Sequence, residues 1–154
     1  MKINHFSYLL ATWFGTGLSP LAPGTIGSLA ALPVAYLISH FIGIVGLGIG
    51  IIIVSGLGVW VANIHSRRTG SHDSKEVVID EVAGQWLTLL LVPADIVFYL
   101  LGFLLFRFTD IAKPWPINMI DRNMKSGLGV MLDDLVAGAI SAIVLWNIWM
   151  WTSL

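Results

Sequence analysis

Two acidic pairs in this sequence have similar surroundings, and their side chains could together bind a divalent cation. In IDEVAG (79–84) and in LDDLVAG (132–138), an acidic pair is followed by one or two aliphatic residues and an Ala-Gly step. Small residues let two helices pack closely, which would bring the carboxylates together. Crowded carboxylates raise one another's pKa values unless a cation lies between them, and Mg²⁺ prefers oxygen ligands. The repeated motif therefore predicts a magnesium site containing four acids: Asp80, Glu81, Asp133 and Asp134.

A single acidic pair has a simpler explanation, because the helix dipole favours acidic side chains in the first turn. Two further acids, Asp110 and Asp121, lie in the polar stretch that precedes the second pair. Their presence, together with the repeat, favours metal binding over helix capping. We therefore predict that Asp110 also binds the metal and takes part in catalysis, and we expect Asp121 nearby.

The segment 107–138 also contains four of the eight Lys and Arg residues: Arg107, Lys113, Arg122 and Lys125. Lys113 precedes Pro114-Trp115-Pro116, where the prolines restrict the backbone, so its ammonium could be held toward a phosphate. Arg122 offers a planar fork of donors that suits phosphate oxygens. Contact with anionic lipid head groups is the alternative for these cations, and we prefer that alternative for Lys125.

A loop rich in Gly, Pro and hydroxyl residues, GTGLSPLAPGTIGSL (15–29), precedes the first long apolar segment. Free N–H groups at a helix start suit a phosphate, so Ser19, Thr25 and Ser28 are candidate substrate-binding residues. The loop lacks the Gly-Lys-Ser/Thr of a Walker motif. On spacing alone, a plain turn is the favoured interpretation.

The composition places these residues in a membrane protein. Of 154 residues, 56% are hydrophobic and only 11% are charged, and the mean hydropathy is +0.85. Soluble domains carry about 25% charged residues. The net charge of -1 argues against a nucleic-acid partner, and the absence of cysteine excludes a cysteine-nucleophile phosphatase. The length suits a single membrane-embedded domain, residues 1–154.

The apolar segments predict an all-α, integral membrane helical bundle. The expected helices are a short interfacial helix within 5–18, followed by 27–40, 44–63, 79–92, 95–109 and 130–151. Polar loops are expected at 65–78 and 110–127.

The apolar segment 82–106 is interrupted by Pro93-Ala94-Asp95, which predicts a helical hairpin rather than one span. An ionisable residue at mid-membrane is costly, whereas Asp95 at a hairpin tip is not. A single span would leave four basic residues on each side of the membrane, but a hairpin places all eight on one side. Basic residues concentrate in cytoplasmic loops. The hairpin therefore predicts a cytoplasmic polar site and a C-terminus on the opposite side.

Four motifs in this order resemble the phosphatidylglycerophosphatase A family over nearly the whole chain: LSPLAPGTIGSL (18–29), IDEVAGQ (79–85), FRFTDIAKPWPI (106–117) and GLGVMLDDLVAG (127–138). The resemblance implies a Mg²⁺-dependent enzyme of the bacterial inner membrane. Such an enzyme removes the terminal phosphate of phosphatidylglycerophosphate in the bilayer, giving phosphatidylglycerol and inorganic phosphate.

The predicted site assigns a role to each candidate residue. The predicted metal ligands are Asp80, Glu81, Asp110, Asp133 and Asp134. The predicted catalytic residues are Asp80, Asp110, Lys113 and Asp134. The predicted substrate-binding residues are Ser19, Thr25, Ser28, Lys113 and Arg122. Attack on phosphorus by a metal-activated water and an aspartyl-phosphate intermediate are both open at this point.

A small membrane transporter or channel that binds a divalent cation through its acidic cluster is the alternative function. It predicts ionisable residues through the depth of the membrane, where Asp95 is the only candidate.

Overall fold

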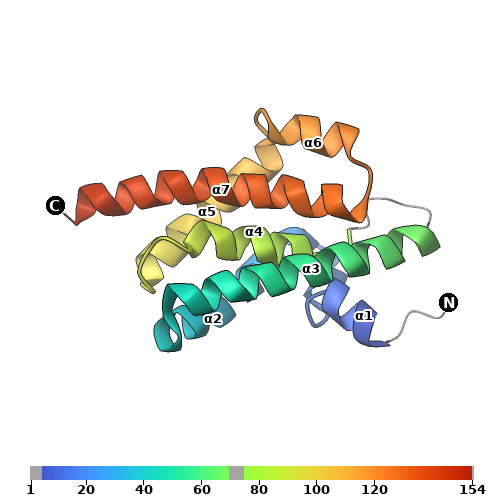
Figure 1. Cartoon of the computed structure of the whole chain (residues 1–154), viewed down its shortest axis with the longest axis horizontal. Helices are drawn as coiled ribbons and strands as arrows, with labels where there is room; N and C mark the ends of the chain where they lie inside the picture. The colour runs from blue at the N-terminus through green and yellow to red at the C-terminus, as the bar shows by residue number, and fades with distance from the viewer. Residues whose placement is uncertain (1–4, 70–74, 154) are drawn as a thin grey trace.

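The computed structural model describes residues 5–69 and 75–153, and within these residues every regular element is a helix (Figure 1). The elements are α1 (His5–Ala11), the 3₁₀ helix η1 (Thr16–Leu18), α2 (Pro23–Phe41), α3 (Gly43–Thr69), α4 (Ile79–Leu89), α5 (Ile96–Ala112), α6 (Ile117–Asn123) and α7 (Gly127–Thr152). The predicted all-α fold is confirmed.

The short helix α4 lies inside the bundle, in contact with α2, α3, α5 and α7 (Figure 1). Nine of its eleven residues are buried. One of them, Trp86, donates its indole N–H to the Ala31 carbonyl at 3.0 Å, which fixes α4 against α2. The element that carries the first acidic pair is therefore held by its neighbours on several sides.

Helices α4 and α7 pack with almost no space between their backbones. A Cβ added to Gly138 would lie 3.0 Å from Gly84 Cα, and one added to Gly84 would lie 2.6 Å from the Asp134 carbonyl oxygen. The Thr88 hydroxyl also donates to the Gly138 carbonyl at 3.3 Å. The expected approach of the two helices through their Ala-Gly steps is confirmed.

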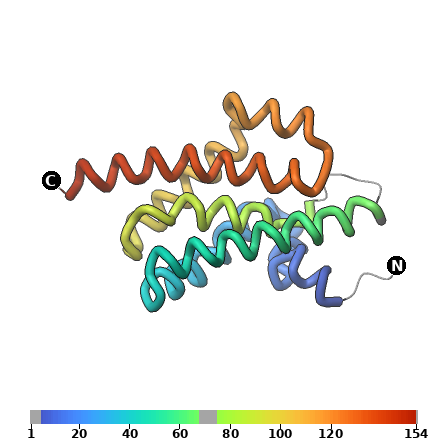
Figure 2. Tube along the Cα trace, viewed as in Figure 1, coloured from blue at the N-terminus to red at the C-terminus, as the bar shows by residue number. Residues whose placement is uncertain are grey.

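The chain reverses direction between α4 and α5, as the tube in Figure 2 shows. Asp95 is exposed at this tip, where its carboxylate accepts the Val97 N–H at 2.8 Å and caps α5. The predicted hairpin is confirmed. It brings the chain that enters α4 and the chain that leaves α5 back toward the same end of the bundle.

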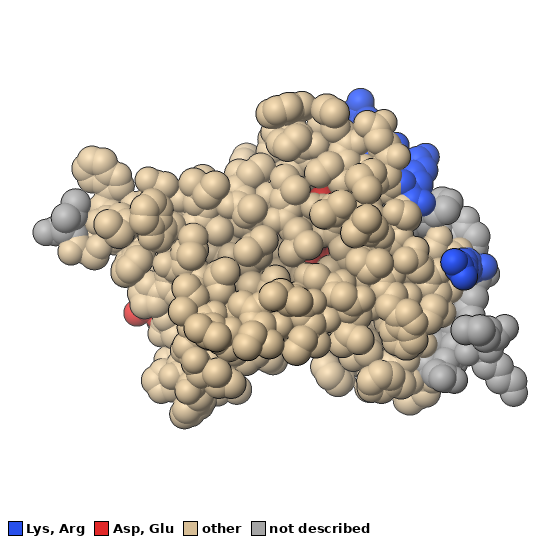
Figure 3. All heavy atoms as spheres, in the orientation of Figure 1, with Lys and Arg blue, Asp and Glu red and all other residues tan. Residues whose placement is uncertain are grey.

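Three helices are long and apolar enough to cross a membrane: α2, residues 43–67 of α3, and α7. Figure 3 shows Lys and Arg atoms at the end of the molecule opposite to the C-terminus. Lys2 and the side chain of Arg68, which both count in the charge argument, lie outside what the structure describes.

Several predicted helix boundaries are wrong. The interfacial helix predicted within 5–18 ends at Ala11, and 110–127 contains α6. Helix α2 begins at Pro23 rather than at residue 27, because proline suits the first helical position. Helix α7 begins at Gly127 rather than at residue 130, because the Ser126 hydroxyl caps the Gly129 N–H at 3.3 Å.

Candidate active site

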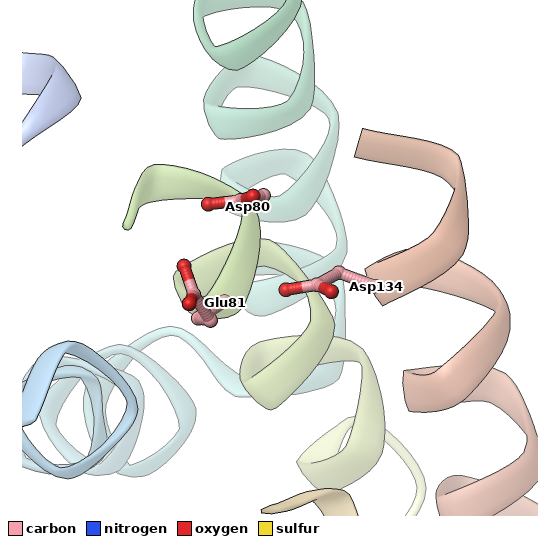
Figure 4. A group of neighbouring side chains, drawn as sticks. All are labelled: Asp80, Glu81 and Asp134. Atoms are coloured by element: carbon pink, nitrogen blue, oxygen red, sulfur yellow. The ribbon is translucent and has the colours of Figure 1, made fainter. Parts of the chain in front are cut away.

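Three carboxylates from two helices point toward one another in the interior of the bundle. Figure 4 shows Asp80 and Glu81 projecting from α4 and Asp134 reaching toward them from α7. One oxygen of each carboxylate lies within 4.8 Å of the others. Asp80 is 8% exposed and Asp134 is 4% exposed. The close packing of α4 on α7 thus concentrates negative charge at a buried position.

This cluster of Asp80, Glu81 and Asp134, called here the three-carboxylate cluster, fits a divalent cation. Each of the three residues has one buried carboxylate oxygen without a hydrogen-bond partner among the described residues. Such oxygens are costly to bury unless a positive partner is present, and Mg²⁺ takes oxygen ligands of this type. Burial raises the pKa of Asp80, and the charge of neighbouring Glu81 raises it further.

The two other predicted metal ligands, Asp110 and Asp133, have cationic side chains as partners. Asp110 lies 2.8 Å from Arg107 Nη1, and Asp133 lies 3.0 Å from Lys113 Nζ. Both carboxylates line the same cavity as the three-carboxylate cluster. Their role as metal ligands stays a prediction.

Lys113 joins three elements near the cluster. Its ammonium lies 2.6 Å from Asp121 at the end of α6 and 3.0 Å from Asp133 of α7. Its backbone caps α5 in the left-handed region (φ 43°), which costs a non-glycine residue about 1 kcal/mol. Partial burial alone would lower the pKa of Lys113, but the hydrogen bonds to both carboxylates raise it above its ordinary value. The side chain is therefore a positioned, charged ammonium at neutral pH.

A cavity of about 710 Å³, called here the acidic cavity, brings these groups together. Its lining includes six carboxylates (Asp80, Glu81, Asp110, Asp121, Asp133 and Asp134) and three cations (Lys113, Arg122 and Lys125). Arg122 is exposed and belongs to α6. Every predicted metal ligand and both predicted phosphate-binding cations thus face one space.

The predicted hydroxyl ligands are less closely associated with the acidic cavity. Ser28 is buried in α2, where its hydroxyl donates to the Gly24 carbonyl at 2.8 Å and accepts from Arg107 at 3.5 Å. The Ser19 hydroxyl donates to the Leu21 carbonyl at 2.9 Å. Thr25 is partly exposed in the first turn of α2. None of the three hydroxyl residues lines the acidic cavity. Their role in substrate binding stays a prediction.

Two residues near the cluster carried no role in the sequence analysis. Arg107 ion-pairs with Asp110 and lies beside Gly24, where a Cβ added to the glycine would be 3.3 Å from Arg107 Nη2. Gln85 is fully buried one helical turn after Glu81, and neither of its amide atoms has a partner among the described residues. The signal in the sequence for Gln85 was an amide side chain between the Ala-Gly step and Trp86, in the part of α4 that follows the acidic pair.

The comparisons with known proteins identify the family. The phosphatidylglycerophosphatase A family model matches residues 9–149. This chain belongs to that family, as the resemblance of its motifs predicted. It is 43% identical to phosphatidylglycerophosphatase A of Escherichia coli (strain K12), with 96% of this chain and 86% of the relative covered. No solved structure matches the chain.

Two further relatives are similar to this chain over most of its length. The Haemophilus influenzae phosphatidylglycerophosphatase A is 35% identical, with 94% of this chain and 89% of the relative covered. A Bacteroides thetaiotaomicron protein provisionally named phosphatidylinositol-3-phosphatase is 37% identical, with 89% of each chain covered. The names of the relatives thus differ: two are named phosphatidylglycerophosphatase A and the third phosphatidylinositol-3-phosphatase.

Proposed function

We propose that this chain hydrolyses the terminal phosphomonoester of phosphatidylglycerophosphate to phosphatidylglycerol and inorganic phosphate, with Mg²⁺ as cofactor. The observation that carries the proposal is the three-carboxylate cluster, whose unpartnered buried oxygens lie in a cavity that also contains Lys113 and Arg122. Family membership and the names of the curated relatives support the substrate.

In this mechanism Asp80, Glu81 and Asp134 hold the cation, which supplies charge stabilisation at the phosphoryl oxygens and lowers the pKa of water. Lys113 and Arg122 bind non-bridging oxygens and orient the phosphoryl group. Asp133 and Asp121 hold the Lys113 ammonium in place. One carboxylate of the acidic cavity, for which Asp110 and Asp134 are the candidates, accepts the proton from the attacking water. An aspartyl-phosphate intermediate uses the same set of carboxylates, with one of them as nucleophile.

The membrane setting completes the proposal. Helices α2, α3 and α7 span the bacterial inner membrane, and the acidic cavity opens at its cytoplasmic face. The gathering of Lys and Arg side chains at one end of the molecule supports this orientation (Figure 3). The two acyl chains stay in the bilayer while the phosphate enters the cavity.

The transporter alternative finds little support in the residue on which it depends. Asp95, its candidate within the membrane, is exposed at the hairpin tip, and its carboxylate is engaged in capping α5. A capping role accounts for this residue without cation transport.

The test is phosphate release from phosphatidylglycerophosphate by membranes that contain the protein. Inverted inner-membrane vesicles, which expose the cytoplasmic face, should release phosphate with Mg²⁺ and stop when the metal is chelated. Sealed spheroplasts should release little from added substrate. Activity no higher than in vesicles lacking the chain would refute the function. Activity in the presence of chelator would refute the metal role, and full activity in sealed spheroplasts would refute the orientation.

A further inference from the structure

A second polar cavity adjoins the three-carboxylate cluster from the side of α2. Its volume is about 410 Å³, and Asp80 and Glu81 line both this cavity and the acidic cavity. The residues that distinguish it are Gly24, Lys75 and Arg107, and we call it the α2 cavity. The two cavities therefore meet at the acidic pair of α4, and the mechanism above uses only one of them.

Arg107 lines the α2 cavity, and its polar contacts use only one of its three guanidinium nitrogens. The side chain is only 14% exposed, and its contacts to Asp110 and to the Ser28 hydroxyl both use Nη1. Its Nε is buried without a hydrogen-bond partner among the described residues. A guanidinium has five N–H donors in a plane and suits the oxygens of a phosphate group. Lys75, which is exposed, adds a second cation at the same cavity.

The first turn of α2 faces the same space. Its N-cap residue, Ala22, has no side-chain atom that could accept a hydrogen bond from the free N–H groups of this turn. The helix dipole adds positive potential at the same end. Gly24 leaves room for the neighbouring groups, because an added Cβ would lie 3.1 Å from Glu81 Cδ and 3.3 Å from Arg107 Nη2. The N–H groups and the two cations thus add positive charge to the same cavity, where the Glu81 carboxylate already lies against Gly24.

We propose that the α2 cavity binds the phosphodiester group of the lipid substrate while the phosphomonoester occupies the acidic cavity. This inference rests on the proposed function, since phosphatidylglycerophosphate carries these two groups one glycerol apart. Because both cavities border Asp80 and Glu81, one substrate can place a phosphate on each side of that pair.

The charges of the two cavities match the charges of the two groups. In the acidic cavity six carboxylates outnumber three cations, so an anion there needs a metal ion as partner. The α2 cavity is lined by two cations, Arg107 and Lys75, and by two carboxylates, Asp80 and Glu81. Its balance suits the single negative charge of a diester, which does not react. Leu21, 79% exposed beside lining residues Pro20 and Ala22, provides apolar surface for the attached acyl chains.

The two products of the reaction can be used as separate probes, one for each cavity. Phosphatidylglycerol retains the phosphodiester, whereas inorganic phosphate represents the phosphomonoester. Binding of each is measured by titration calorimetry on the purified, Mg²⁺-loaded protein in detergent, with a short-chain phosphatidylglycerol and with orthophosphate as the probes. Arg107→Gln should weaken phosphatidylglycerol binding about tenfold or more, as expected for one charged hydrogen bond. It should weaken orthophosphate binding by a much smaller factor, because Arg107 affects the acidic cavity only through its ion pair with Asp110. Arg122→Gln should show the opposite pattern.

Three further variants distinguish a local loss of binding from a general loss of structure. Lys75→Gln alters an exposed side chain and should weaken phosphatidylglycerol binding by a smaller factor than Arg107→Gln. Arg107→Lys should restore part of the affinity. Arg67→Gln removes an exposed cation that lines neither cavity and should change nothing.

The proposal fails if Arg107→Gln and Lys75→Gln weaken orthophosphate binding as much as phosphatidylglycerol binding, because the cavity would then hold the phosphomonoester. It also fails if neither variant affects phosphatidylglycerol. A wild-type protein that binds phosphatidylglycerol through Arg107 but releases no phosphate from the substrate would refute the proposed function alone.

Discussion

The acidic pairs of α4 and α7 have similar sequences but different surroundings. Asp80 and Glu81 lie in the first turn of α4, whereas Asp133 and Asp134 follow the start of α7 by nearly two turns. The helix dipole can therefore stabilise only the first pair. Among the residues that the structure describes, both acids of α4 have a buried oxygen without a hydrogen-bond partner, but in α7 only Asp134 does. The two copies of the motif therefore place their acids differently: both acids of α4 lie in the three-carboxylate cluster, whereas Asp133 of α7 pairs with Lys113.

Helix geometry explains this difference. Adjacent residues on an α-helix point about 100° apart, because a turn contains 3.6 residues. In α7 this angle directs Asp134 toward α4 and Asp133 toward Lys113. In α4 the two acids also point in different directions, but the side chain of Glu81 is one carbon longer. Its carboxylate can therefore lie beside those of Asp80 and Asp134. The three-carboxylate cluster therefore takes both acids of the pair in α4 but only one acid of the pair in α7.

The largest effect is expected at Asp134. Asp134→Asn keeps the size of the side chain but removes a charged ligand, so activity should fall about 100-fold or more, corresponding to roughly 3 kcal/mol. Mg²⁺ should no longer raise the unfolding temperature, because a ligand stabilises only the state that binds it. Without Mg²⁺ the variant should be at least as stable as the wild type, since it lacks one unpartnered buried charge.

Asp80→Asn should behave in the same way. Phosphate release and thermal unfolding with and without Mg²⁺ measure both effects. Full Mg²⁺-dependent activity in either variant would show that the three-carboxylate cluster is not the metal site.

A smaller loss is expected when the two helices are forced apart. A Cβ at position 138 would overlap the backbone of Gly84, so Gly138→Ala should separate the acidic residues of α4 from Asp134. Activity should fall about tenfold, the unfolding temperature should drop, and the Mg²⁺ concentration for half-maximal activity should rise.

Gly56→Ala is the matched control for this change. Gly56 lies in α3, and a Cβ there would meet nothing within 4 Å. The control should retain wild-type activity and Mg²⁺ dependence. Equal effects of Gly138→Ala and Gly56→Ala would contradict the argument that close packing positions the site.

The sequence was sufficient to predict the all-α fold, the hairpin and the packing of α4 against α7, because its strongest signals are local. The Ala-Gly steps indicated which helices touch, and Pro93 and Asp95 indicated where the chain turns. Both signals depend on backbone sterics and on the cost of burying charge, which act whatever the final packing.

The sequence could not show which acids would contact a cation and which would contact one another. Whether an acid faces a cation or another acid depends on how α7 packs against α4, α5 and α6, which are distant or separate elements in the sequence. The partnership of Asp133 with Lys113 also requires the position of α6 and the left-handed backbone of Lys113. Arg107 acquires its role only when α2 is placed beside α5, across a sequence separation of 79 residues from Ser28.

The smallest effect on activity is expected for the exposed ion pair between Lys113 and Asp121. Comparing it with the buried ion pair between Lys113 and Asp133 tests whether Asp133 differs in role from Asp134. Asp121 is 42% exposed, so its ion pair is screened by water, and Asp121→Asn should lower activity less than about threefold. Asp133, at 9%, shares the same ammonium from a buried position, and Asp133→Asn should cost about tenfold. In double-mutant cycles with Lys113→Gln, the coupling energy for Asp133 should exceed that for Asp121. Equal coupling energies would mean that both acids hold Lys113 alike, and would contradict the assignment of Asp133 as its main partner.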